Sequence, residues 1–464
     1  MNKFLNNFTS VTHYYKLLYK LSSFINNLKI SYLIFFIFIL ILAACFEISL
    51  LGFLYVLLKA FIDPNYYQGN FFFKFLLEFF GINTNRELII YLSIFFIFAC
   101  VVAGIIRLLF LYLLTKIVYN FGNTITNICY QKILYEDFIN LYSKNTNDTL
   151  SIFQKMPIVN NSVYVTLLMI YNFVNFIFIF SILLIIDYQI TIYTSFAFLL
   201  FYSIIILIFK NRIYVNGSII SEEQGTNIKI LRETFNGFRD ILINNYQKFY
   251  NNLFQKSYSR LLRSSEENRF LYSAPRPILD TFLLTAIGII ISVNSGNYSN
   301  LEKLIPIFAV IAVASQRILP ILNQIYAAHM GNVDATPHTS FIFNFLKNPI
   351  NNKNKKLKTL IKFKKQISFS NVSFYYNEDE KNLILKDINL KIKHGSRIGI
   401  IGKSGSGKST FADLVLGLLN PSRGKITVDG KIILDKKNSW YKNVAGVPQN
   451  IFITDQSIAQ NIAF

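Results

Sequence analysis

The sequence predicts an α-helical membrane bundle of six transmembrane helices, followed by part of a smaller α/β domain. Of its 464 residues, 53% are hydrophobic and only 15% are charged, whereas about 25% charged is usual in a soluble chain. The apolar residues gather in long runs that a water-exposed surface would not carry. From residue 367 onward these runs give way to short alternating segments typical of strands. The composition therefore excludes a wholly soluble protein and a disordered one.

The transmembrane domain is expected over residues 30–346. Its first apolar run lies between Lys29 and Lys59, with Glu47 as the single charge, and exceeds the ~20 residues that a membrane helix needs. A run of this length is also unlike a cleaved signal peptide. The five further runs lie at about 88–115, 163–186, 188–209, 277–293 and 304–326.

Basic residues predict the orientation of the bundle. The chain has a net charge of +21, and much of this charge flanks the apolar runs. Residues 1–29 hold four lysines and no acid, 210–275 hold ten basic residues, and the linker 347–366 holds eight lysines and no acid. By the positive-inside rule these segments and both termini are cytoplasmic. The membrane thus accounts for the charge, and no nucleic acid partner is expected.

Residues 367–464 contain a phosphate-binding loop. Arg397–Ile401 has the pattern of a strand and Phe411–Leu419 that of a helix, which is the setting that the motif G-x-x-x-x-G-K-[ST] requires. The motif consists of Gly402, Lys403, Ser404, Gly405, Ser406, Gly407, Lys408, Ser409 and Thr410. Its glycines let backbone N–H groups turn toward phosphate oxygens, and Lys408 adds a full positive charge. Ser409 is expected to bind the Mg²⁺ that accompanies ATP.

Two further residues lie in register with this loop. Tyr376 is 26 residues before Gly402, and Gln449 is 41 residues after Lys408. Together with the six apolar runs, this order of motifs resembles an ABC exporter half-transporter. The resemblance implies that Tyr376 stacks on the adenine of ATP, and that Gln449 reaches Mg²⁺ and faces the membrane domain. It also implies that a second copy, or a paralogous half-transporter, completes each ATP site.

The resemblance covers only part of the family's nucleotide-binding domain. The sequence ends at Phe464, 15 residues past Gln449, and the family's signature motif, Walker B strand and switch histidine have no counterpart in it. We therefore expect an N-terminal portion of a longer protein. ATP hydrolysis coupled to transport is expected of the longer protein, and none of residues 1–464 alone.

Arginines near the apolar runs are the candidate cargo-binding residues. Arg107 and Arg317 interrupt uncharged stretches, and Arg276 stands at the start of another. Guanidinium groups suit phosphate or pyrophosphate recognition because they are planar, permanently charged and bidentate. The alternative is that they pair with Glu47 or Asp280 and brace the bundle.

The favoured function is ATP-driven flipping or export of a lipid-linked oligosaccharide or a related lipid or polysaccharide precursor. It rests on residues 233–254, which are similar to a cytoplasmic connection in exporters of lipid-linked sugars. Short helices near Tyr142–Asp148 and Gly237–Ile243 are expected to contact the nucleotide-binding domains. The residue usage is typical of an AT-rich bacterial genome, and so indicates the bacterial inner membrane.

Three other functions remain open at this point. One is export of a peptide, a protein or a drug by the same kind of transporter. Another is a membrane-anchored P-loop kinase or signalling protein, although such proteins have fewer crossings around a large outer domain. The third is a non-catalytic remnant that only binds nucleotide or a partner subunit.

Overall fold

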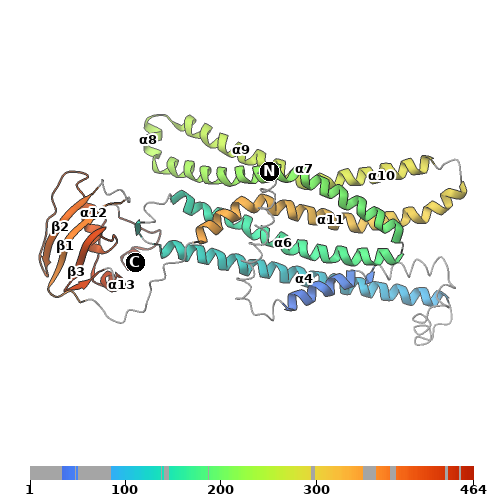
Figure 1. Cartoon of the computed structure of the whole chain (residues 1–464), viewed down its shortest axis with the longest axis horizontal. Coiled ribbons are helices and arrows are strands. Elements are labelled where there is room, and N and C mark those ends of the chain that lie inside the picture. The colour runs from blue at the N-terminus through green and yellow to red at the C-terminus, as the bar shows by residue number, and fades with distance from the viewer. Residues whose placement is uncertain are drawn as a thin grey trace. The chain divides into compact units, whose positions relative to one another are not determined.

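The computed structural model describes residues 34–47, 49–50, 85–136, 138–139, 146–186, 188–293, 298–347, 362–376, 383–433, 437–448 and 451–463. The chain divides into two compact units (Figure 1). The first comprises Met1–Tyr130 and Asn147–Asn348, and the second comprises Gln131–Thr146 and Pro349–Phe464.

The first unit is a bundle of long helices (Figure 1). An apolar helix over Ile34–Glu47 is followed by α4 (Asn85–Leu134), α6 (Thr146–Ile186), α7 (Tyr188–Asn236), α8 (Phe238–Ile243), α9 (Gln247–Ser273), α10 (Pro275–Val293) and α11 (Tyr298–Leu346). Helix α7 packs against both α9 and α11 along much of its length. The short helix α8 connects α7 to α9, where a short cytoplasmic helix was predicted from the sequence.

Within the described residues, three helices are long and apolar enough to cross a membrane. They are Ile89–Leu134, Thr149–Ile185 and Thr191–Asn236, and they cover most of three of the predicted runs. The runs 277–293 and 304–326 lie in α10 and α11, and part of the first lies in Ile34–Glu47. This is a multi-pass helical membrane protein, whereas the full count of six crossings stays a prediction.

The helices are longer than the membrane requires. Thr191–Asn236 contains 46 residues, which is about 69 Å at ~1.5 Å per residue, against a hydrocarbon core of ~30 Å. The apolar run 188–209 therefore marks only the first part of α7. The rest of α7 continues beyond it and packs against the polar helix α9.

Apolar side chains are found both between the helices and on their outer surface. Phe110 and Leu114 are fully buried, while Leu108 is 67% exposed and Leu207 75% exposed. Outward-facing leucines of this kind are costly in water and suited to lipid. The distribution is that of a bundle surrounded by hydrocarbon.

The second unit contains an antiparallel sheet with the strand order β2-β1-β3-β4. Its elements are β1 (Gln366–Phe374), β2 (Leu385–Lys393), α12 (Lys408–Leu416), β3 (Arg423–Val428), β4 (Lys431–Ile432), α13 (Lys437–Trp440), η3 (Tyr441–Asn443) and α14 (Ile458–Ile462). Ile367 of β1 pairs with Ile392 of β2 and with Val428 of β3. The inner face of the sheet packs on α12 and on the buried Trp440.

The prediction of a strand at Arg397–Ile401 is wrong. These residues belong to no strand, and Ile398, Ile400 and Ile401 are 50%, 48% and 99% exposed. A strand needs a neighbour to accept and donate its backbone hydrogen bonds. Within the described part of the chain, none pairs with this segment.

The helix predicted after the loop is confirmed, with shifted ends. It was predicted as Phe411–Leu419 and is observed as Lys408–Leu416. Gly417 ends it with a φ of +78°, a left-handed conformation that glycine adopts at little cost. Residues 348–361, between α11 and the sheet, lie outside the described residues.

Candidate nucleotide-binding site

The phosphate-binding loop leads directly into the first turn of α12. Gly405 and Gly407 have φ angles of +79° and +87°, in the left-handed region that residues with a Cβ rarely adopt. A Cβ on Gly407 would also lie 3.0 Å from a methyl of Leu385 and 3.1 Å from a methyl of Ile384. The glycines therefore permit the loop to turn and to pack closely against the start of β2.

Lys408 folds back across the loop. Its Nζ donates hydrogen bonds to the carbonyl oxygen of Gly402 (2.8 Å) and to that of Lys403 (2.7 Å). An ammonium group has three donors, so one donor remains for an oxygen outside the loop. The charge of Lys408 and the positive end of α12 thus meet at one place, which favours an anion such as a phosphate.

Tyr376 reaches the same helix from the end of β1. Its hydroxyl lies 3.3 Å from the Thr410 hydroxyl, and its ring meets Phe374 edge to face at 4.9 Å between centroids. The side chain is 39% exposed, so part of the ring is open to a ligand. The structure therefore brings Tyr376 and the loop together, and Ser409 is exposed on the first turn of α12.

Gln449 lies outside the described residues. Its predicted role at Mg²⁺, together with that of Ser409, stays a prediction. The residues before it, 444–448, have no regular secondary structure, and Val447 is 91% exposed.

The candidate cargo arginines face acids of their own chain where they are described. Arg107 Nη1 lies 3.8 Å from Glu47 Oε1, and Arg276 Nε lies 3.8 Å from Asp280 Oδ2 one helical turn away. The backbone of Arg317 belongs to α11, but its side chain lies outside the described residues. The two described contacts have the bracing geometry that the sequence left open as the alternative to cargo binding.

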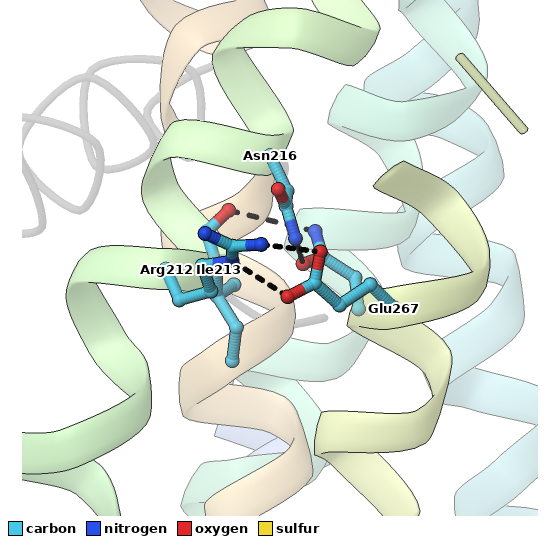
Figure 2. Close-up of polar contacts among 5 residues, drawn as sticks. Arg212, Ile213, Asn216 and Glu267 are labelled. Carbon is cyan, nitrogen blue, oxygen red and sulfur yellow. Dashed lines mark hydrogen bonds and ion pairs between the residues drawn. The ribbon is translucent and has the colours of Figure 1, made fainter. Parts of the chain in front are cut away.

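A polar network in the bundle was not predicted from the sequence. Figure 2 shows Arg212 and Asn216 of α7 beside Glu267 of α9. Arg212 Nε donates a hydrogen bond to Glu267 Oε1 at 2.6 Å. This bond is the main reason why the pKa of Glu267 lies below its usual value, and a hydrogen bond from the Asn216 amide lowers the pKa further. The only sequence signal is the unusual number of polar residues on α9.

The loop region is similar to known transporters in sequence. Residues 385–462 match the family model described as "ABC transporter". The alpha-hemolysin translocation ATP-binding protein HlyB of Proteus vulgaris is 40% identical over 106 residues, which are 23% of this chain and 15% of that protein. The putative multidrug export ATP-binding/permease protein YgaD of Bacillus subtilis is 37% identical over 98 residues, 21% of this chain and 17% of that protein. The sequence matches thus cover a small share of each relative.

The whole chain is similar to a solved transporter in fold. A bacterial Atm1-family ABC exporter with ATP bound matches with a TM-score of 0.69 and 12% sequence identity, over 93% of this chain and 74% of that chain. At that identity the likeness establishes the fold alone. The chain therefore has the fold of that exporter, and residues 385–462 are similar to the ABC transporter family.

Proposed function

We propose that this chain forms the membrane domain and the first part of the nucleotide-binding domain of a half-transporter that uses ATP and Mg²⁺ to export its cargo. The observation that carries the proposal is the meeting of Tyr376, the glycine loop and Lys408 at the N-terminus of α12, in a chain with long apolar helices. ATP hydrolysis is proposed for the complete protein. The proposed location is the bacterial inner membrane, with both termini cytoplasmic.

The residues of the site fit a nucleoside triphosphate with its Mg²⁺. The loop offers backbone N–H groups and Lys408 one ammonium donor to phosphate oxygens, while the exposed Ser409 hydroxyl suits the metal. Tyr376 offers a partly open ring for the base. ATP, when bound, supplies the phosphoanhydride bond whose cleavage drives transport. The role of these residues is to hold and orient it.

Short apolar segments are the proposed contacts between the bundle and the nucleotide-binding domains. Helix α8 exposes Phe238 (53%), Leu242 (47%) and Ile243 (66%), an apolar tip on a polar hairpin. Ile139, in the connection between α4 and α6, belongs to the second unit and packs on that unit's own apolar core. The rest of the predicted Tyr142–Asp148 helix lies largely outside the described residues. The proposed partner is a second copy, or a paralogous half-transporter.

Two kinds of cargo have support. Residues 233–254 and the arginines Arg107, Arg276 and Arg317 are the sequence features that favour an anionic lipid-linked oligosaccharide or a related precursor. The relatives named above are a toxin translocator and a putative multidrug exporter, which support a peptide, protein or drug equally well. The Arg107–Glu47 pair is longer than a hydrogen bond, so guanidinium donors remain for a phosphate.

The cargo proposal predicts that Arg107→Lys reduces cargo stimulation of the complete protein. In proteoliposomes, a lipid pyrophosphate carrying an oligosaccharide should stimulate the ATPase of the wild type. Arg107→Lys should need about tenfold more lipid for the same stimulation, because lysine loses the bidentate geometry.

Arg212→Lys is the matched control, because it is the same change in a described ion pair outside the apolar runs. It should respond to the lipid as the wild type does. Full lipid stimulation of Arg107→Lys, or equal stimulation of the wild type by neutral drugs, would favour the peptide or drug exporter instead.

A further inference from the structure

A partly buried carboxyl group joins three helices where the bundle extends beyond its apolar runs. Asp334 of α11 accepts a hydrogen bond from Asn268 Nδ2 of α9 at 2.9 Å. Asn268 in turn accepts one from Asn216 Nδ2 of α7, also at 2.9 Å. Asn268 and Asn216 are 1% and 3% exposed, so this chain of bonds is shielded from water.

The backbone of α7 approaches Asp334 unusually closely. A Cβ built on Gly217 would lie 2.5 Å from the Asp334 carbonyl oxygen and 2.7 Å from its Oδ1. Atoms at such distances overlap, so any larger residue at 217 would push α11 away from α7. The contact between these helices therefore depends on a glycine placed directly opposite the carboxyl group.

The groups that face Asp334 are neutral near pH 7. Helix α9 presents the Asn268 amide and the titratable Tyr272 hydroxyl, and α7 presents Gly217. Within the described residues, no cation forms an ion pair with Asp334. An ionised carboxylate at this position thus relies on hydrogen bonds alone, which makes its charge costly to bury.

We infer that Asp334, Asn268 and Gly217 form a proton-sensitive lock that holds α11 against the α7–α9 hairpin. The protonated carboxyl group packs between the helices without a buried charge, and its ionisation favours a looser arrangement that admits water. The lock lies in the bundle itself and needs neither ATP nor the proposed cargo.

The direction of the pH dependence follows from the acid's environment. Burial raises the pKa of Asp334 to about 6, and hydrogen bonds from Tyr272 and Asn268 lower this pKa by a smaller amount. A carboxyl group with a higher pKa in the packed state than in water binds its proton more tightly when packed. The packed state is therefore favoured at acidic pH, and this contribution is lost as the pH rises from about 4 through about 6.

Hydrogen exchange of the full chain in lipid nanodiscs tests the lock, without added nucleotide or cargo. After correction for the chemical exchange rate, amides of α11 around Asp334 should lose protection between pH 5 and pH 7.5, with a midpoint near 6. The loss over this interval should be about tenfold, because a pKa difference of roughly two gives about 100-fold in total and about a tenfold part of it falls below pH 5. Asp334→Asn, which cannot ionise, should keep high protection at both pH values.

Two further variants separate the lock from general effects. Asp240→Asn makes the same change at an exposed acid of α8 and should lose protection with pH as the wild type does. Gly217→Ala should show low protection at both pH values, while the β1 amides of the other unit stay protected and report that the chain is folded. The inference is overturned if Asp334→Asn follows the wild-type pH profile, if the wild type shows no pH dependence, or if Gly217→Ala exchanges like the wild type. A failure of the transport proposal would leave all of these results unchanged.

Discussion

Replacing Lys408 with alanine is expected to lower the ATP turnover of the complete protein by at least about 100-fold, the usual loss when one donor to a developing charge is removed. The Lys408 ammonium is held over the loop by the carbonyl groups of Gly402 and Lys403. Its remaining donor is placed for a phosphate oxygen, where it would stabilise the charge of the transferred phosphoryl group. Phosphate release by the purified protein in lipid measures the effect.

Lys403→Ala is the matched control for this experiment. Lys403 belongs to the same loop, but only its backbone carbonyl contacts Lys408. The variant should therefore keep most of the wild-type turnover. Equal turnover in Lys408→Ala and the wild type would show that the loop does not bind the reacting phosphate.

Gly424→Ala is expected to destabilise the nucleotide-binding unit by roughly 2–5 kcal/mol. Gly424 has a φ of +79°, which costs an alanine about 1–2 kcal/mol. Its added Cβ would overlap the Asn371 carbonyl group and lie 2.5 Å from the Ser370 carbonyl oxygen. Forcing these backbone atoms apart costs a further ~1–3 kcal/mol, because β1 is held in the sheet on both sides.

Trp440 gives a direct measurement of this effect. It is the single tryptophan of the chain and is 1% exposed in the core of the same unit, so its emission reports urea unfolding there. Gly430→Ala is the control, since Gly430 has the same φ of +79° but open space around its Cβ position. Equal unfolding midpoints for the two variants would contradict the predicted clash.

The phosphate-binding loop could be predicted from the sequence because its determinants are contiguous. The glycines at 405 and 407 fix the turn, and Lys408 and Ser409 begin the helix that follows. Tyr376 could be placed only through the resemblance, since 34 residues separate it from Thr410. The structure supplies the contact that a spacing alone does not show.

The strand before the loop and the lengths of the helices could not be predicted in the same way. Arg397–Ile401 has the composition of a strand, but a strand exists only where another segment accepts its hydrogen bonds. Apolar runs likewise mark the part of a helix that suits lipid. They give no sign that α7 continues to Asn236 by packing against α9.

No short sequence pattern predicts the proposed lock in the bundle. Asn216 and Asn268 are 52 residues apart, and Asn268 and Asp334 are 66 apart. Each is an ordinary polar residue on a helix until three helices bring them together. Networks of this kind depend on tertiary packing, so periodicity and motifs do not predict them.

Photolabelling with an azido-adenine analogue of ATP tests whether Tyr376 and the loop form one ATP site. We expect an adduct on Tyr376, located by mass spectrometry of the labelled chain. Excess ATP with Mg²⁺ should prevent labelling, and Lys408→Ala should reduce it strongly. An adduct confined to residues away from Tyr376, or labelling that persists in excess ATP, would show that Tyr376 and the loop do not share an ATP site.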